Sequence, residues 1–149
     1  MPLLCLATAA LSQETTPTTD PIRFVHHVDG RLVSSTHPIY DEEGTLTASI
    51  GYTYDEQGVV ETRQMTGYNA HGQIERRIIY SADEILLLEE TYKYDRKGHM
   101  TRHEQTTYEV GRPIKTVETR KYTYNRDGSI KECRYYHNGV LVCTLPQDQ

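Results

Sequence analysis

The sequence predicts an all-β protein: an antiparallel meander of about nine strands that form a long twisted or curled sheet. Three observations predict it. A pattern of Tyr, Asp or Asn, two variable residues and Gly recurs along the chain, about ten residues separate most copies, and Tyr supplies 12 aromatic residues against one Phe and no Trp. Tyr favours a pleated, half-buried surface. Each copy is therefore expected to be one strand followed by one turn, and the turns are expected to alternate between the two ends of the sheet.

The two ends of the chain are expected to lie outside this sheet. Residues 1–13 are apolar or small and are predicted to be a signal peptide or its remnant, although the positively charged start of such a peptide is missing. A disordered or strand-like terminus is the alternative. Residues 14–21 hold two Pro and have no hydrophobic period, which predicts a disordered linker. The repeat domain is expected over residues 22–145, with a tail at 146–149.

The repeated pattern has the chemistry of a hairpin turn. Asp or Asn at the first turn position and Gly at the fourth are typical of a type I turn whose last residue is left-handed, which makes a three-residue hairpin loop. The full copies begin at Tyr40, Tyr54, Tyr68, Tyr94 and Tyr124, and the degenerate copies begin at His26, Tyr80, Tyr108 and Tyr135.

This turn predicts which residues face one another across each hairpin. Tyr54 is expected opposite Val60, and Tyr52 opposite Thr62. The same rule pairs Tyr68 with Ile74, Tyr80 with Leu86, Tyr94 with Met100, Tyr108 with Ile114 and Tyr124 with Ile130. All these positions are even-numbered, so one face of the sheet is expected to collect them.

The last hairpin carries two cysteines. If its turn runs from Tyr136 to Gly139, Cys133 lies directly opposite Cys143, and a disulfide is predicted for an exported protein. This register would send Tyr135 to the face opposite Tyr124, so a bulge between Ile130 and Tyr135 is expected as well.

The middle of the predicted common face is charged. It carries Arg76, Glu90, Arg102, Glu104, Glu118 and Arg120. These are too many charges for a dry core, so an open sheet is favoured over a closed barrel, and cross-strand ion pairs such as Arg76 with Glu90 are expected.

Three segments carry a resemblance to a known family. The segments 51–60, 91–100 and 121–130, each built around a Tyr-x-Tyr-Asp/Asn-x-x-Gly core, resemble the Rhs/YD-repeat family, and the resemblance spans residues 26–142. It implies an extended, spiralling β-sheet that acts as a scaffold. The shell function of the large members is not expected, because this chain is too short to close a shell. The segment 135–141 is similar to MORN-type hairpin repeats, and neither family supplies catalytic residues.

Composition and motifs argue against several function classes. A net charge of -5 with dispersed signs does not favour nucleic-acid binding, and no apolar stretch is long enough to insert into a membrane as a helix. His99 and His103 lie about 13 Å apart on one strand at ~3.3 Å per residue, too far to share a metal ion. No nucleophile motif or phosphate loop is present. No enzyme activity, cofactor or metal is therefore expected.

The remaining hypothesis is a non-enzymatic exported binding or scaffold module of the bacterial envelope or extracellular space. It would engage a protein partner through its sheet face or edges, or associate with itself by an edge. The alternative is a carbohydrate-binding module that uses rows of Tyr on the sheet. Its candidate ligand-binding residues are Tyr52, Tyr92, Tyr122, Arg76, Arg102 and Arg120. A hydrolase with Glu104 in its site is a more distant third hypothesis.

Overall fold

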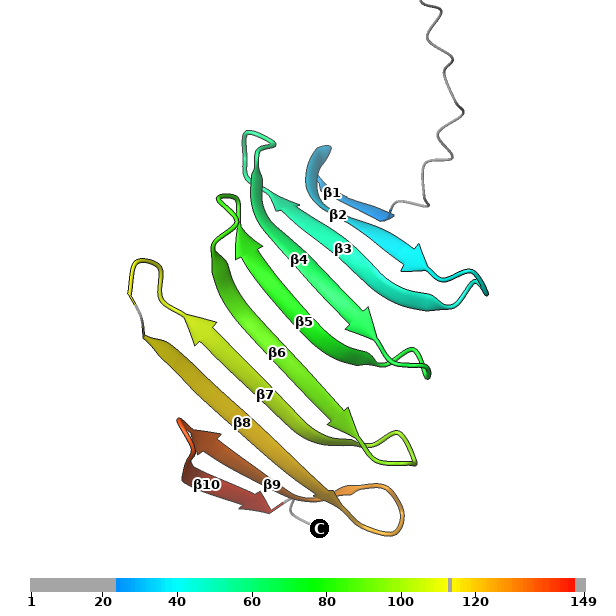
Figure 1. Cartoon of the computed structure of the whole chain (residues 1–149), viewed down its shortest axis with the longest axis vertical. Coiled ribbons are helices and arrows are strands. Elements are labelled where there is room, and N and C mark those ends of the chain that lie inside the picture. The colour runs from blue at the N-terminus through cyan, green and yellow to red at the C-terminus, as the bar shows by residue number, and fades with distance from the viewer. Residues whose placement is uncertain (1–23, 113, 147–149) are drawn as a thin grey trace, which may run out of the picture.

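The computed structural model describes residues 24–112 and 114–146, which form one ten-stranded sheet (Figure 1). Each strand pairs with the next one along the chain, and each pair with a described register is antiparallel. The predicted signal peptide and linker lie outside the described residues. The strands are β1 (Phe24–Val28), β2 (Arg31–Tyr40), β3 (Leu46–Tyr54), β4 (Val60–Tyr68), β5 (Ile74–Ser81), β6 (Leu86–Tyr94), β7 (Met100–Tyr108), β8 (Lys115–Tyr124), β9 (Ile130–His137) and β10 (Val140–Pro146).

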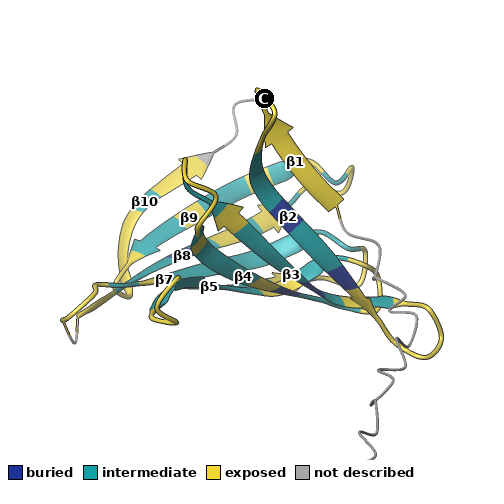
Figure 2. Ribbon diagram, turned by 90° about the horizontal axis from the view of Figure 1, so that it is seen from above, coloured by how far each residue is buried: buried dark blue, intermediate teal, exposed yellow. Residues whose placement is uncertain are grey.

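The sheet is twisted, curled and open. The strand direction rotates from β2 to β10, and both ends of the sheet rise on the same side of the central strands (Figure 2). The first and last strands do not pair with each other. The predicted all-β meander is therefore confirmed as an open sheet. The sheet has ten strands instead of about nine, because each of the nine copies of the pattern forms a turn and nine turns join ten strands.

The repeated turns are built as predicted. In the turn after β3, the backbone N–H of Asp55 donates to the carbonyl of Val59 at 2.9 Å, and Gly58 is left-handed with φ 79°. The Asp55 carboxylate accepts hydrogen bonds from the backbone N–H groups of Gln57 and Val59 at 2.9 and 2.8 Å. Asp or Asn is thus favoured as an acceptor inside the loop, and Gly is favoured because it adopts the positive φ without strain.

Two of the degenerate copies form shorter turns, and the copy at Tyr108 forms a longer one, in which the backbone N–H of Glu109 donates to the carbonyl of Ile114 at 3.3 Å. Asp29-Gly30 and Asn138-Gly139 are two-residue loops in which both residues have positive φ, as hairpins of this kind require. The predicted turn from Tyr136 to Gly139 is therefore wrong, because the loop contains only Asn138 and Gly139. The turn after β5 keeps the backbone hydrogen bonds of the full copies, with Glu84 at the left-handed position that Gly occupies there, at φ 58°.

The predicted Tyr and apolar pairs are confirmed in five hairpins, but the single face that they implied is wrong. Tyr54 lies opposite Val60, whereas Thr53 lies opposite Thr62, so Glu61 is an extra residue in β4. Similar irregularities follow the pairs at Tyr68, Tyr80, Tyr94 and Tyr124. The one after Tyr124 includes the bulge that was expected after Ile130. Tyr108 is the exception, because it lies opposite Lys115 and not Ile114.

Each extra residue reverses the relation between residue number and face. Alternation and register divide the sheet into two faces. The Ile50 face carries Ile39, Ala48, Ile50, Tyr52, Met65, Gly67, Arg76, Ile78, Glu89, Arg102 and Glu104. The Glu90 face carries Ser49, Thr66, Arg77, Glu90, Tyr92, His103, Glu118, Arg120, Tyr122, Cys133 and Tyr135.

The Tyr at the end of a strand attaches that strand to the preceding one through its hydroxyl. The Tyr54 hydroxyl lies 2.9 Å from Oγ of Ser35, and the Tyr94 hydroxyl donates to the carbonyl of Ile74 at 2.7 Å. The Tyr124 hydroxyl donates to the carbonyl of Met100 at 2.6 Å. Tyr therefore contributes a directed hydrogen bond at the turn in addition to its packing.

The sheet has no apolar core within the described residues, where no large aliphatic or aromatic side chain is buried. The buried polar and charged residues are Ser35, Ser49, Thr66, Glu90 and Thr119. Hydrogen bonds and half-buried cross-strand pairs therefore carry more of the stability than in a two-layer domain.

The close contact between consecutive turns at the same end of the sheet gives a first prediction. An added Cβ at Gly128, where φ is 89°, would lie 3.3 Å from Nε2 of His99, whereas an added Cβ at Gly58 meets nothing within 4 Å. Gly128→Ala is expected to lower the free energy of unfolding by about 2 kcal/mol, and the control Gly58→Ala by about 1 kcal/mol from backbone strain alone. Urea denaturation measures both. Equal losses would contradict the proposed contact between the turns.

Candidate functional site

A buried carboxylate organises the centre of the Glu90 face. Glu90 is 4% exposed, and Nε of Arg77 on β5 donates to its Oε2 at 2.5 Å. Nε2 of His103 on β7 lies 3.0 Å from Oε1 of the same carboxylate. Nη2 of Arg77 also donates to the hydroxyl of Tyr92 at 3.3 Å. One carboxylate thus connects three adjacent strands.

Opposing effects act on the acidity of Glu90. Burial raises the pKa of this carboxyl, whereas the hydrogen bonds from Arg77, the charge of Arg77 and the hydrogen bond with His103 lower it. The net result is a pKa below the ordinary range for Glu. The carboxylate is therefore a stably ionised structural group and is unsuited to act as a general acid.

A row of planar side chains crosses the same face beside Glu90. Tyr92, His103, Arg120 and Tyr135 lie opposite one another on four consecutive strands. The rings of Tyr92 and His103 are stacked with centroids 4.7 Å apart, and the Arg120 guanidinium lies 5.7 Å from the centroid of Tyr135. These side chains pack on one another, which occupies part of the surface that a sugar ring would need.

The structure does not gather the predicted ligand-binding residues into one site. Tyr92, Tyr122 and Arg120 lie on the Glu90 face, whereas Tyr52, Arg76 and Arg102 lie on the Ile50 face. The expectation that all six share a face fails because each bulge exchanges odd and even positions.

The six predicted mid-sheet charges are divided in the same way. Arg76 pairs with Glu89, with Nη2 2.7 Å from Oε1, and the predicted partner Glu90 binds Arg77 instead. Glu104 accepts a hydrogen bond from Arg102 at 2.5 Å, and Glu118 lies 3.9 Å from Arg120. Ion pairing is therefore present, but between different partners and on both faces.

The two cysteines are free thiols in the structure, and the predicted register between them is wrong. Cys143 lies opposite Tyr135, and Cys133 lies opposite Leu145, because the turn has two residues and Val142 is an extra residue in β10. The cysteines are diagonal neighbours on one face, a placement that would need backbone movement to form a disulfide. Burial raises the pKa of the Cys133 thiol.

The Ile50 face contains an apolar hollow that the sequence patterns did not reveal. Ile39, Ala48, Gly67 and Arg76 lie in one row across β2 to β5, and Ile50, Met65 and Ile78 lie in the next row. Ala48 has a small side chain and Gly67 has none, which leaves a hollow of about 200 Å³ between the larger residues. Ile39 and Met65 remain 42% and 41% exposed. The hollow therefore offers apolar surface to a partner.

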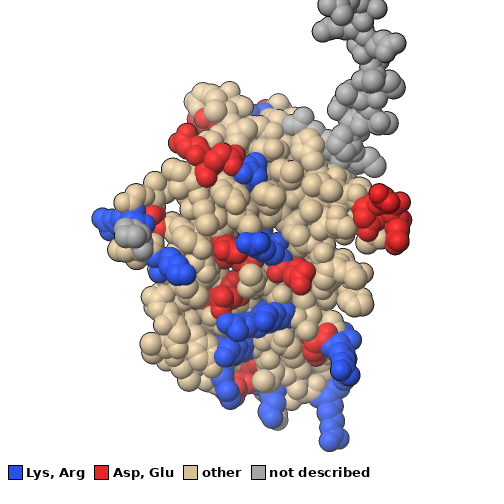
Figure 3. All heavy atoms as spheres, viewed as in Figure 1, with Lys and Arg blue, Asp and Glu red and all other residues tan. Residues whose placement is uncertain are grey.

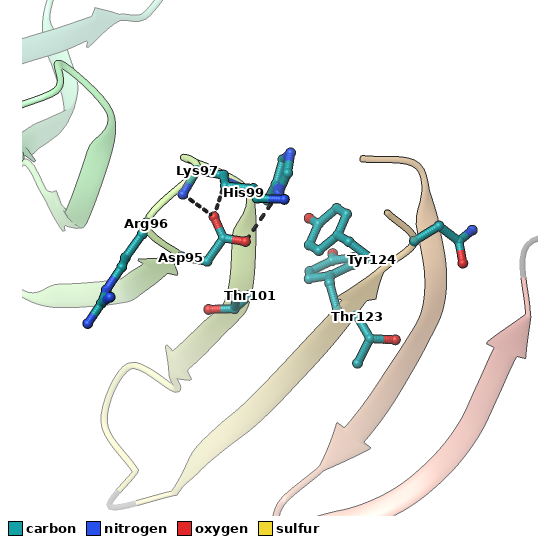
Figure 4. Close-up of a pocket in the computed structure, with 9 residues that line it drawn as sticks. Asp95, Arg96, Lys97, His99, Thr101, Thr123 and Tyr124 are labelled. Carbon is teal, nitrogen blue, oxygen red and sulfur yellow. Dashed lines mark hydrogen bonds and ion pairs between the residues drawn. The ribbon is translucent and has the colours of Figure 1, made fainter. Parts of the chain in front are cut away.

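A second depression lies between two turns at the same end of the sheet (Figure 4). Asp95 and His99 form one wall, Tyr124 forms the other, and the His99 and Tyr124 rings are stacked at 4.8 Å. The carboxylate of Asp95 accepts hydrogen bonds from the backbone N–H groups of His99 and Lys97, which lower the pKa of Asp95. These polar groups already bond within the turn, so the depression is explained by the fold.

The part of the chain that the structure describes contains neither a cluster of metal-binding side chains nor a membrane-spanning helix. No three His, Cys, Asp or Glu side chains are placed there to share a metal ion. Within residues 24–112 and 114–146, no helix has the length and apolar character that crossing a membrane requires.

Comparisons with known proteins give only distant similarities. No protein-family model and no curated protein matches the chain. Among solved structures, it is similar to part of the Tc holotoxin pore of Photorhabdus luminescens, with 14% identity over 83% of this chain and 9% of that chain, at a TM-score of 0.30. A complex of TcdB2, TccC3 and Cdc42 matches at 15% identity over 79% of this chain and 9% of that chain, at a TM-score of 0.26.

A third structure is closer in size. A protein of unknown function from Bacteroides fragilis matches at 14% identity over 85% of this chain and 91% of that chain, at a TM-score of 0.22. The chain thus spans about a tenth of the length of the first two structures and most of the third. Similarities at these TM-scores assign no function.

Proposed function

We propose that this protein is a non-enzymatic binding or scaffold module, exported to the bacterial envelope or the extracellular space, whose sheet engages a protein partner. The observation that supports this proposal is the apolar hollow between Ile39, Met65 and Ile78. No large apolar side chain is buried among the described residues, so this exposed apolar surface does not complete a core. An apolar side chain of a partner protein would fill the hollow and displace water from it.

The charged rim of the hollow indicates the chemistry of this partner. The side chain of Arg76 is 57% exposed, and its Nε and Nη2 both donate to the same oxygen of Glu89, Oε1. The other N–H groups of this guanidinium can donate hydrogen bonds to a partner. A segment with a Leu, Ile, Met or Phe followed by a carboxylate or a backbone carbonyl matches this arrangement. The partner would bind through one central apolar anchor with polar contacts at the edge.

The proposal is tested by filling the hollow without disturbing the strand. Gly67→Val adds a β-branched side chain where an added Cβ meets only the carbonyl oxygen of Arg76, at 4.0 Å. Since Gly weakens a strand, this variant should be at least as stable as the wild type. The control Thr123→Val places the same side chain on the Ile50 face far from the hollow.

The expected result is a loss of partner binding in Gly67→Val alone. Partner proteins are identified by cross-linking the full-length wild type in envelope and culture-medium fractions of the cells that make it. Their affinities for the purified variants are then measured by titration calorimetry. Losing one apolar anchor should weaken binding at least about tenfold. Equal affinity of wild type and Gly67→Val for every captured protein would overturn the proposal.

A carbohydrate-binding function remains the alternative, and we propose the Glu90 face for it. Tyr92, Tyr122 and Arg120 lie there together, and the Tyr122 ring is opposite the small side chain of Cys133. Glycan-array binding that is lost in Tyr122→Ala and kept in Tyr52→Ala would favour this function.

We also propose that the chain belongs to the Rhs/YD-repeat family. This proposal is supported by the repeated pattern in segments 51–60, 91–100 and 121–130.

A further inference from the structure

The two edge strands leave a row of backbone groups without partners in the sheet. Among residues 24–112 and 114–146, β1 pairs only with β2, and β10 pairs only with β9. The outward N–H and C=O groups of an edge strand can form a new ladder with another strand. Natural edges usually carry Lys, Pro or a bulge that prevents such pairing.

Both edges carry apolar side chains and few of these protections. Neither Phe24–Val28 nor Val140–Pro146 contains Asp, Glu, Lys or Arg. In β1 the exposed fractions are 61% for Phe24 and 50% for Val25. In β10 they are 69% for Val140 and 57% for Leu145. β10 has one extra residue, Val142, and ends at Pro146, but Cys143, Thr144 and Leu145 form a regular ladder between them.

The regions beside the two edges carry opposite charges. From Phe24 to Val59 there are six Asp and Glu residues and one Arg, including the exposed turn Asp41-Glu42-Glu43. From Lys115 to Pro146 there are six Lys and Arg residues and three Asp and Glu residues. Figure 3 shows this separation, with Lys and Arg gathered in the lower part of the view and the acidic β2–β3 turn protruding at the right.

We propose that the partner of each edge is a second copy of this chain, so that β10 of one copy pairs with β1 of the next. The pairing would continue the antiparallel sheet from copy to copy and would bury the exposed Val, Leu and Phe side chains of both edges. Opposite charges favour this head-to-tail contact. Pairing of β1 with β1, or of β10 with β10, would bring like-charged regions together.

The contact joins two different surfaces, so it leaves one edge free at each end of an assembly. The wild type should therefore form species that grow with concentration instead of stopping at a dimer. High salt should reduce the average mass, because it screens the attraction between the charged regions. This inference does not depend on the hollow, and Gly67→Val should associate like the wild type.

Two edge variants test the direction of the contact. Val25→Lys places a charge on β1, and Leu145→Lys places a charge on β10, each at a half-exposed position where the fold should tolerate it. Sedimentation velocity of full-length protein should show each variant alone as a monomer. An equimolar mixture should form a dimer and nothing larger, because it contains one intact β10 and one intact β1. The control Thr123→Lys should associate like the wild type.

Three results would overturn the proposal: a monomeric wild type at every concentration, association of either edge variant alone, or a mixture that stays monomeric. The second result would indicate a contact between identical edges or through a face. None of these results bears on partner binding in the hollow, which is measured separately with Gly67→Val.

Discussion

Replacing Glu90 with Ala is expected to lower the free energy of unfolding by about 3 kcal/mol, one of the two largest losses expected from a small change in this chain. Glu90 is buried and accepts hydrogen bonds from Arg77 while it contacts His103. Removing one member of a buried pair leaves the other charge without compensation, which costs more than the pair itself contributes. Urea denaturation followed by circular dichroism measures the loss.

Glu89 offers a matched control on the opposite face of the same strand. Its carboxylate pairs with Arg76, whose side chain is 57% exposed. Exposed ion pairs contribute little, so Glu89→Ala should cost less than about 1 kcal/mol. Similar losses for the two variants would contradict the idea that Glu90 is an organising residue.

The stability of the wild type should also depend on Glu90 as the pH falls. The folded-state pKa of this carboxyl is lowered, so its contribution is present above the unfolded-state pKa of about 4.3 and is lost as the pH falls through the lower folded value. Glu90→Gln should therefore lose stability near neutral pH and show a flatter dependence below about pH 4. An unchanged slope in that range would contradict this assignment.

Inserting one Ala between Arg63 and Gln64 is expected to cost more than about 3 kcal/mol or to prevent folding, beyond the range of most single changes. The ladder is regular at this point, with Arg63 opposite Tyr52 and Gln64 opposite Gly51. With the added residue, the β4 residues on one side of the insertion would have to exchange faces, or β4 would have to open its ladders with both neighbours. Equilibrium unfolding and amide hydrogen exchange across β4 measure the outcome.

The control removes an extra residue instead of adding one. Glu61 lies between the Tyr54–Val60 pair and the Thr53–Thr62 pair, so its deletion leaves these pairs consecutive and no later residue changes face. Deleting Glu61 should therefore cost less than the insertion, about 1 kcal/mol. If the two changes cost the same, the register of β4 would not be what sets the faces.

Local chemistry explains why much of the fold is predictable from the sequence. The residues that define a hairpin turn lie within five positions of one another, as Asp55 and Gly58 do, and they fix the Tyr54–Val60 pair directly. The strand order follows because consecutive hairpins with short loops have adjacent strands. These features need no knowledge of the rest of the chain.

The faces could not be predicted, because one extra residue in each bulge affects every later position. The hollow combines Ile39, Ile50, Met65 and Ile78, whose numbers alternate between odd and even, and the rule of even positions separates them. A signal was present: Val60 and Met65 are apolar residues of one strand at an odd spacing, which a regular strand does not place on one face. The Arg77–Glu90 pair was missed for the same reason.

The Tyr hydroxyl bonds give the sheet a property of a linear lattice. Each inner strand contacts its two neighbours, and the Tyr54, Tyr94 and Tyr124 hydroxyls form hydrogen bonds to the strand before their own. Stability then resembles a sum of similar hairpin units and the couplings between adjacent units. Such a chain can begin to order at any hairpin and extend in both directions, so its unfolding should proceed from the ends inward instead of in a single global step.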